Sequence, residues 1–256
     1  MEPTALPPCP ADIDPVEWRL RLELAACYRL FDWMGWTTLI YNHISLRVPG
    51  SAPQFLINPF GLNYNEVTAR NLVKIDVEGR KLDASPHPVN VAGFVIHSAI
   101  HAARADAHCI AHTHTTAGMA VACKASGLRH DNFNSALLHG RVAYHDFEGV
   151  TTDAAEKPRL LASMGQKPIL ILRNHGLLVT AGSVAETFAL MATLEKACEV
   201  QVASDAMAGP NIPIGADVLA AVPAQNAAME KAGSLPGRLV FHASLRRAGI
   251  RYEDLA

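Results

Sequence analysis

The sequence predicts an α/β protein, built as a three-layer α/β/α sandwich around a central mixed, mainly antiparallel sheet. Long segments with apolar residues at helical spacing stand near both ends of the chain, and short β-branched segments lie between them. Strands and helices do not alternate strictly and no long repeat is visible, which disfavours a purely parallel sheet and a solenoid. Half of the 256 residues are apolar and 18% are charged, enough to bury a large core.

The N-terminal part begins with a Pro-rich stretch, residues 1–13, that we expect to be a flexible tail. Asp14 and Pro15 suit the N-cap and first turn of a helix that Gly35 ends. Residues 14–256 are predicted to form a single domain, with C-terminal helices from about residue 210. Before residue 108, the pattern predicts strands within 37–50 and 54–61, a hairpin through Glu78 and Gly79, and a helix that begins near Asn90.

The C-terminal half begins with a predicted strand over 109–114 that leads into a helix of small residues. A polar segment follows and is expected to be a loop. Ser183 and Glu186 have capping-box spacing and begin a long helix. Two further helices are predicted, one beginning at Pro223 and one after Pro236. The remaining strands are expected within 141–149, at 169–173 and at 176–180.

Charge and cysteine content exclude several classes of protein. The formal net charge is −2 and no long basic run exists, which disfavours a nucleic-acid or membrane-surface partner. The five cysteines are an odd number without CxxC spacing, as expected for reduced thiols inside a cell. The N-terminal segment MEPTALPPCP lacks the apolar stretch of a signal peptide, and no other run is long enough to span a bilayer. We therefore expect a cytoplasmic protein.

Three histidines form the strongest candidate site. In a strand over 109–114, His112 and His114 point to the same face, one pleat apart. His175 lies in an Asn-His-Gly turn between two apolar runs. Three neutral imidazoles that leave a coordination position open are typical of a catalytic metal site. Each histidine alone is more often a core or loop residue, so the prediction depends on the three together.

Several segments together resemble the class II aldolase/adducin superfamily over roughly residues 15–205. They are YNHISLRVPG (41–50), FLINPFG (55–61), AGFVIHSAIHAARAD (92–106), CIAHTHTTAG (109–118), RVAYHDFEG (141–149) and ILRNHGLL (171–178). The resemblance implies an α/β/α sandwich that assembles as a homotetramer, with active sites between neighbouring subunits. It also implies a divalent metal ion held by His112, His114 and His175, which binds vicinal oxygens of a small-molecule substrate. Zinc is the first expectation, and an all-imidazole site also suits manganese or iron.

The chain departs from fuculose-phosphate aldolase at the positions that matter for its chemistry. That enzyme has a metal-approaching, proton-transferring glutamate four residues before the counterpart of His97, where this chain has Gly93. Its phosphate-binding serines and threonine correspond to Val91, Ala92 and Phe60, none of which holds an anion through its side chain. The Gly61 amide remains available, but the resemblance argues against a sugar-phosphate substrate.

Gly93-Phe94 and the RVAYHDFEG segment are instead similar to the adducin-like branch of the superfamily. That branch includes the adducin head, a cytoskeletal protein without known chemistry. The resemblance therefore leaves open whether the protein is an enzyme, although we expect one.

Further candidates surround the three histidines. Asn42, whose family counterpart contacts substrate, is predicted to bind substrate and to assist catalysis. Ser45, Gly61 and Gly93 are predicted to line the substrate site. His130 and Tyr144 are candidate acid/base groups. An equally good interpretation is that they belong to a polar loop and an edge strand and have no catalytic role. Weaker candidates are His43, Arg47, Asp131, His145 and Tyr252, while His97 and His101 share a helix face and are expected to pack behind the site.

These observations favour a metal-dependent lyase that acts by decarboxylation or retro-aldol cleavage. The expected substrate is a small, non-phosphorylated hydroxy/keto or hydroxylated aromatic acid. Decarboxylation needs no base to deprotonate a hydroxyl, so it suffers less from the missing glutamate, and apolar replacements suit a ring better than a phosphate. The alternatives are a non-catalytic assembly or binding protein like the adducin head and, less favoured, a non-haem iron oxygenase.

Overall fold

A seven-stranded sheet in the order β3-β2-β1-β4-β7-β6-β5 forms the middle of the computed structural model, which describes residues 6–50, 53–149, 154–231 and 236–256. Only β5 and β6 run parallel, so the predicted mixed, mainly antiparallel sheet is confirmed. The strands are β1 (His43–Val48), β2 (Gln54–Ile57), β3 (Val73–Asp76), β4 (Cys109–Thr113), β5 (Val142–His145), β6 (Ile169–Leu172) and β7 (Gly176–Ala181).

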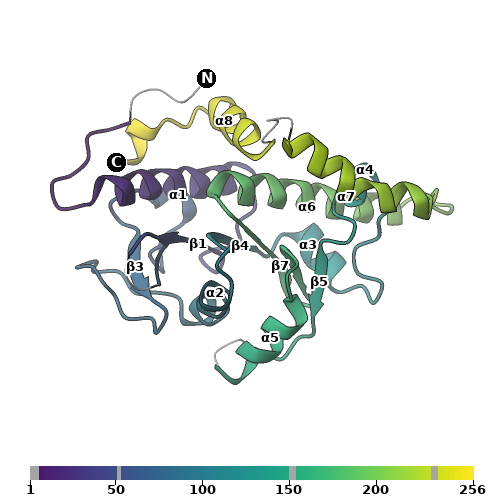
Figure 1. Ribbon diagram of the computed structural model, residues 1–256, viewed down its shortest axis with the longest axis horizontal. Helices are drawn as coiled ribbons and strands as arrows, with labels where there is room; N and C mark the ends of the chain where they lie inside the picture. The colour runs from purple at the N-terminus through teal and green to yellow at the C-terminus, as the bar shows by residue number, and fades with distance from the viewer. Residues whose placement is uncertain (1–5, 51–52, 150–153, 232–235) are drawn as a thin grey trace.

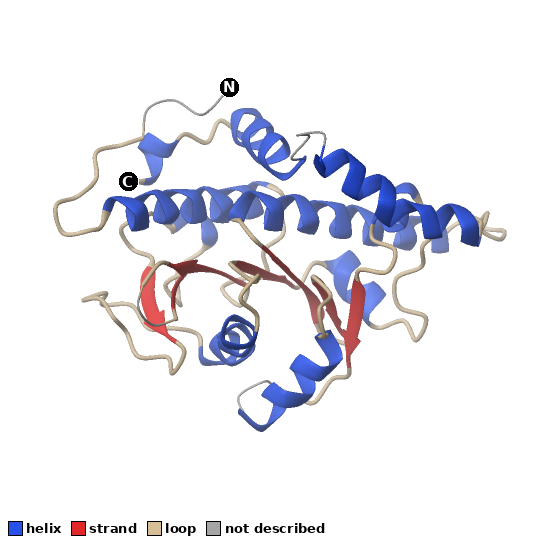
Figure 2. Ribbon diagram, in the orientation of Figure 1, coloured by secondary structure: helices blue, strands red, loops and turns tan. Residues whose placement is uncertain are grey.

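Helices cover both faces of the sheet, which confirms the predicted sandwich (Figures 1 and 2). One face is covered by the long helices α1 (Pro15–Trp33) and α6 (Val184–Asp205), with α3 (Thr116–Ala122) beside them and α8 (Pro236–Ala248) packed on their outer side. The opposite face is covered by α2 (Val91–Ala103) and α5 (Lys157–Met164). The short helix α4 (Phe133–Leu137) and the peripheral helix α7 (Ala216–Lys231) are the remaining α-helices of the described residues. No helix in the described ranges is long and apolar enough to cross a membrane.

Local sequence explains where the long helices begin and end. The Asp14 carboxylate accepts hydrogen bonds from the backbone N–H groups of Val16 and Glu17 at 2.8 and 3.1 Å, as an N-cap does. Gly35 follows α1 with a φ of 71°, a conformation that glycine adopts without steric cost. The Ser183 hydroxyl accepts the N–H of Glu186 at 3.2 Å and begins α6, the N-cap half of the predicted capping box.

The structure corrects some element predictions. The helix α7 begins at Ala216 rather than at Pro223, which is exposed and lies inside the helix, where proline lacks the N–H of the usual helical hydrogen bond. The polar segment predicted as a loop contains α4, because the Asn132 side chain caps it by accepting the Ser135 N–H at 3.0 Å. Of the predicted flexible tail, residues 1–5 lie outside the described residues. In α2, the side chains of Val91 and Ala92 are also outside the described part of the structure.

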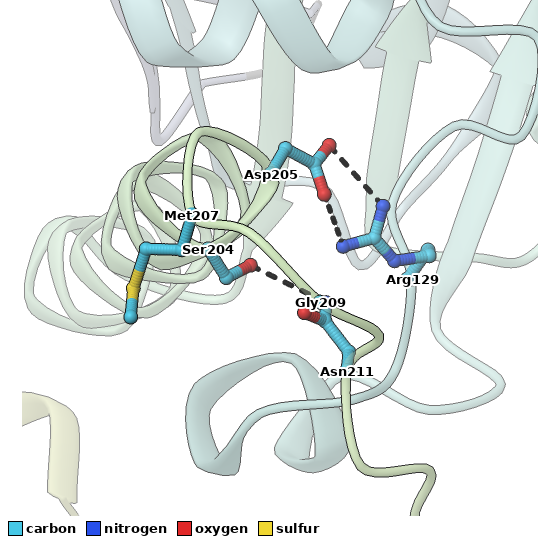
Figure 3. Close-up of a pocket in the computed structure, with 6 residues that line it drawn as sticks. All are labelled: Arg129, Ser204, Asp205, Met207, Gly209 and Asn211. Carbon is cyan, nitrogen blue, oxygen red and sulfur yellow. Dashed lines mark hydrogen bonds and ion pairs between the residues drawn. The ribbon is translucent and has the colours of Figure 1, made fainter.

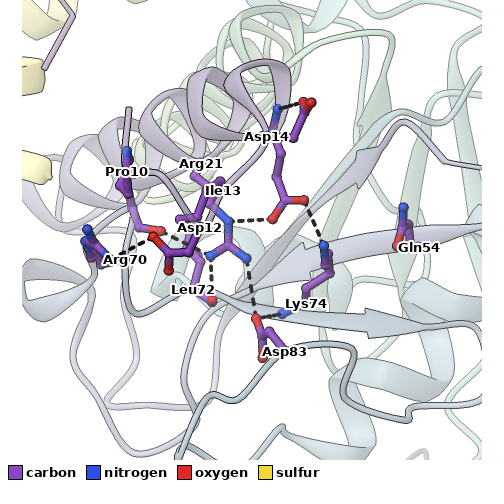
Figure 4. Close-up of polar contacts among 12 residues, drawn as sticks. Pro10, Asp12, Ile13, Asp14, Arg21, Gln54, Arg70, Leu72, Lys74 and Asp83 are labelled. Atoms are coloured by element: carbon purple, nitrogen blue, oxygen red, sulfur yellow. Dashed lines mark hydrogen bonds and ion pairs between the residues drawn. The ribbon is translucent and has the colours of Figure 1, made fainter. Parts of the chain in front are cut away.

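A buried arginine links the first helix to the edge of the sheet (Figure 4). Arg21 on α1 is 4% exposed and pairs with Glu17 one turn earlier at 2.8 Å. Its guanidinium also donates to the Leu72 carbonyl at 2.8 Å, just before β3, while Lys74 on β3 pairs with Glu17 at 2.8 Å. These contacts fix the first half of α1 against the β3 edge of the sheet.

Candidate metal centre

The three predicted histidines converge at one end of the sheet. His112 lies on β4 and pairs in register with Leu178 on the neighbouring strand β7, while His114 follows one residue after β4 ends. His175 lies in the tight turn between β6 and β7, where Asn174 adopts a φ of 57°. Asparagine tolerates this left-handed conformation better than most residues. The turn therefore brings His175 back over the end of β4.

The ring nitrogens lie close enough together to share one metal ion. His112 Nε2 lies 2.7 Å from His114 Nε2 and 3.3 Å from His175 Nε2, and the ligand atoms of all three lie within 4.8 Å of one another. Tetrahedral zinc with nitrogen ligands at about 2.0–2.1 Å separates those nitrogens by roughly 3.3 Å. His112 Nδ1 donates to the Leu177 carbonyl at 2.8 Å, which leaves the lone pair of Nε2 directed into the cluster. These residues fit a divalent metal ion.

The protonation states of the rings also suit metal binding. Burial lowers the pKa of His114 to about 4, with a smaller contribution from His175. Burial likewise holds the pKa of His112 well below its usual range and lowers that of His175. All three imidazoles are therefore neutral at pH 7, the form that coordinates a cation.

A fourth histidine packs against the cluster from β1. His43 is 3% exposed, and its ring centroid lies 5.1 Å from that of His112 and 4.5 Å from that of His97 on α2. Its other neighbour is Gly93, one turn before His97, where a Cβ would lie within 3.0 Å of three atoms of the His43 ring. Gly93 thus makes room for this imidazole, whose Nδ1 is buried without a partner among the described residues.

Behind His43, a chain of hydrogen bonds fixes the state of His97. His101 Nδ1 donates to the Ala107 carbonyl at 2.9 Å, so Nε2 of this neutral ring accepts from the Ser45 hydroxyl at 2.8 Å. The Ser45 oxygen then accepts from His97 Nδ1 at 2.6 Å, which leaves a lone pair on the buried His97 Nε2. His97 and His101 lie behind the site, as the sequence predicted. The Ser45 hydroxyl is engaged in this chain, and its role in substrate binding stays a prediction.

Asn42 orders the loop that meets His114. Its Oδ1 accepts the Thr38 N–H at 2.6 Å, and the Thr38 hydroxyl donates to the His114 carbonyl at 3.0 Å. Its Nδ2 is buried and has no hydrogen-bond partner among the described residues. A buried donor without a partner is costly, so this amide is suited to a bound oxygen atom.

The other predicted acid/base groups make contacts of their own. His130 Nδ1 donates to the Ser135 carbonyl at 2.6 Å, and the Tyr144 hydroxyl accepts the Leu128 N–H at 3.0 Å. Tyr252 is buried in the core against α1, and burial raises the pKa of its hydroxyl. Gly61 lies in the turn after β2 with a φ of 104°. The catalytic roles of His130 and Tyr144 and the binding role of Gly61 therefore remain predictions.

Three residues near the histidines were not predicted from the sequence. Phe147 is 55% exposed, and its ring centroid lies 6.3 Å from that of His175. Glu156 is buried, bonds to His145 Nε2 at 3.3 Å and lines a pocket together with His175. Glu195 on α6 binds the threonines on either side of His114. Nothing in the sequence places these three residues next to the histidines. The one available sign was Glu195, an acidic residue among the apolar positions of α6.

A separate pocket of about 270 Å³ lies at the end of α6 and is lined by Arg129, Ser204, Asp205, Met207, Gly209 and Asn211 (Figure 3). Its cation, Arg129, already pairs with Asp205 at 2.6 Å and with Asp131 at 2.8 Å. The charge of this pocket is therefore compensated, and we do not assign it an anionic ligand.

Comparisons with known proteins agree with the fold. The family model of the class II aldolase and adducin N-terminal domain matches residues 22–202. The crystal structure of an aldolase II superfamily protein from Pseudomonas syringae is 42% identical, covers 92% of this chain and 94% of its own, and gives a TM-score of 0.85. The L-fuculose 1-phosphate aldolase from Glaciozyma antarctica is 30% identical over 96% of both chains, with a TM-score of 0.81.

Rat alpha-adducin is 49% identical over 199 residues, which are 77% of this chain and 27% of the adducin. The chain therefore spans about a quarter of the length of that relative. Fold and site together define a domain of class II aldolase type. The chain belongs to the class II aldolase and adducin family.

Proposed function

We propose that this protein is a metal-dependent lyase that decarboxylates, or cleaves by retro-aldol reaction, a small non-phosphorylated hydroxy/keto or hydroxylated aromatic acid. The observation that carries the proposal is the convergence of three neutral imidazoles, with His112 Nε2 lying 2.7 and 3.3 Å from Nε2 of His114 and His175. The relatives named as aldolases support the reaction class. Zinc is the metal we expect, with manganese and iron as the ions to compare.

The residues beside the histidines support a carbon-rich acid as substrate. Phe147 presents an exposed aromatic ring 6.3 Å from the His175 ring, an apolar wall that suits a substrate ring or carbon chain. By the family resemblance, Phe60 stands at one of the positions that bind phosphate in fuculose-phosphate aldolase. Its side chain offers no hydrogen bond to an anion. Asn42 Nδ2 would donate to a substrate oxygen, since this buried amide has no hydrogen-bond partner in the part of the chain that the structure describes.

A bound divalent ion would act as a Lewis acid and lower the cost of negative charge on a substrate oxygen. His112, His114 and His175 would hold it. The carbon that loses the carboxyl group must then gain a proton, and the hydrogen-bonded pair His145 and Glu156 is our candidate for its source, since both residues line the pocket with His175. We also propose, as the family resemblance implies, that the protein is a homotetramer, in which His130 or Tyr144 could reach a neighbouring site.

The adducin relationship supports a second candidate, a non-catalytic assembly or binding module. The identity to alpha-adducin, 49%, exceeds the 30% identity to the fuculose-phosphate aldolase, although it covers less of this chain. In that case the histidines would stabilise the domain or bind an ion without turnover.

The test combines metal analysis with a substrate panel. Purified protein is analysed for bound metal, loaded in turn with zinc, manganese or ferrous iron, and incubated with hydroxylated aromatic acids and hydroxy-keto acids. Released carbon dioxide and aldehyde are then measured. We expect turnover with at least one panel. We expect His112→Ala to lose about a hundredfold or more, because removing one of three ligands weakens the binding of a metal ion that itself lowers the barrier by several kcal/mol.

His108→Ala is the matched control, because His108 precedes the same strand and its side chain is exposed. This variant should keep the metal content and the activity of the wild type. A fully loaded protein that turns over neither panel, and whose His112→Ala variant differs only in stability, would favour the binding module. Oxygen uptake with iron but not with zinc would instead indicate an oxygenase.

A further inference from the structure

A buried carboxylate lies on the opposite side of the peptide segment that carries two of the histidines. Glu195 on α6 is 1% exposed, and each of its oxygens accepts a different hydrogen bond. The Thr113 hydroxyl donates to Oε1 at 2.7 Å and the Thr115 hydroxyl donates to Oε2 at 2.6 Å. These threonines directly precede and follow His114, so one carboxylate holds both sides of that residue.

Packing alone does not explain an acidic side chain at this position. The buried neighbours of Glu195 on α6 include Met191, Leu194 and Cys198, which are apolar. Burying a carboxylate among them carries a desolvation cost, which raises the pKa of Glu195 despite its two hydroxyl donors. An apolar side chain would fill this position without that cost but could not accept the two hydrogen bonds. We therefore attribute the carboxylate to its hydrogen bonds with Thr113 and Thr115.

The position of His114 depends on these contacts because the sheet does not hold it. The β4–β7 ladder pairs residues from Cys109 to Thr113 and so fixes His112, but it ends one residue before His114. The His114 backbone carbonyl is held on one side by the Thr38 hydroxyl at 3.0 Å. On the other side, the Thr113 and Thr115 side chains connect the segment to the rigid helix through Glu195.

We propose that Glu195 is a positioning residue of the metal centre, which sets the separation between the His112 and His114 imidazoles by fixing Thr113 and Thr115. This inference rests on the metal centre of the proposed function. It assigns to α6, a helix that contributes no ligand, a share of the metal affinity. Ties of this kind between ligand-bearing segments and the protein typically change metal affinity when they are removed.

The test measures zinc affinity by competition with a chelator and records the visible absorption of the cobalt(II)-loaded protein, which reports the ligand geometry. The variants are Glu195→Gln, which keeps the size but leaves one threonine without an acceptor oxygen, and Thr113→Val, which removes one donor. Thr113→Ser, which restores a hydroxyl, is the rescue variant. The matched control is Thr187→Val, because Thr187 also lies on α6 and its hydroxyl donates to the carbonyl of Cys109, at the other end of β4, at 3.3 Å.

We expect zinc affinity to fall by about 10- to 100-fold in Glu195→Gln and Thr113→Val, with a changed cobalt spectrum. Thr113→Ser should recover most of the affinity, and Thr187→Val should bind zinc like the wild type even where it lowers stability. The inference is overturned if Thr113→Val and Glu195→Gln bind zinc as tightly as Thr187→Val. If wild-type protein binds neither ion, the metal centre itself is refuted and this inference falls with it.

Discussion

Replacing Gly93 by alanine tests whether the space at this position belongs to His43. Gly93 lies in α2, where alanine normally stabilises a helix by about 0.5–1 kcal/mol relative to glycine. A Cβ at residue 93, however, would lie within 3.0 Å of Cδ2, Nε2 and Cγ of His43. That ring is 3% exposed and is flanked by His97 and His112, so it has little room to move away.

We therefore expect Gly93→Ala to lower the free energy of unfolding by about 1–3 kcal/mol, the usual cost of overpacking a buried site. In a His43→Ala background the obstacle is gone and only the helix preference remains. There the same substitution should raise the free energy of unfolding by about 0.5–1 kcal/mol. The sign of the effect should thus reverse, with a coupling energy of roughly 1.5–4 kcal/mol, which begins within the usual range of about 0.5–3 kcal/mol for residues in contact and extends above it.

The assay is urea unfolding of the wild type, the two single variants and the double variant, all with metal removed by a chelator. Equal effects of Gly93→Ala in the two backgrounds would refute the reasoning. The result bears on function too, because a glutamate introduced at this position must first displace His43. Gly93→Glu alone should therefore not reproduce the carboxylate of fuculose-phosphate aldolase.

Two further predictions concern stability. Burial lowers the pKa of His43 and His101 from 6.5 to about 3, so both rings are neutral in the folded protein and must be protonated as acid unfolds it. The stability they contribute is complete above pH 6.5 and is lost as the pH falls toward 3. It amounts to about 5 kcal/mol each, so metal-free protein followed by circular dichroism should unfold cooperatively within this range; a native spectrum at pH 3 would contradict this. The buried Tyr28 hydroxyl bonds to the backbone of Ile44 and Asn58, so Tyr28→Phe should cost about 1–3 kcal/mol in urea unfolding, and an unchanged midpoint would argue against it.

The sequence was sufficient to find the three metal-binding candidates because each depends on local geometry. His112 and His114 share a face through strand alternation, and His175 occupies a turn that its neighbours Asn174 and Gly176 make recognisable. The strand itself ends at Thr113, one residue earlier than expected. The long helices were predicted for the same reason, since caps such as Asp14 act within a few residues.

The residues around the ligands could not be predicted because their contacts join distant segments. The contact between His43 and Gly93 requires the packing of α2 on β1, and the bonds from Thr113 and Thr115 to Glu195 span 80 residues or more. Ser45 illustrates the same difficulty, since its strand position suggests the site while its hydroxyl bonds to His97 and His101. The alternation of side chains along a strand predicts which face of the sheet a residue occupies. Only the fold determines which other groups it contacts on that face.

The residues that surround the three ligands are where differences in chemistry within this family should be sought. The three histidines proposed as ligands match in kind the set implied for aldolases, so they do not by themselves distinguish an aldolase from a decarboxylase or a binding module. At Gly93, in contrast, the chain has exchanged a carboxylate position for a buried imidazole that faces His112. A carboxylate beside the metal can accept a proton from a substrate hydroxyl, which retro-aldol cleavage needs and decarboxylation does not. The neutral, buried His43 ring is a poor substitute for such a base, because burial holds its pKa at about 3. The exchange at residue 93 therefore favours decarboxylation over retro-aldol cleavage, which would need its base from elsewhere, such as the His145 and Glu156 pair beside His175.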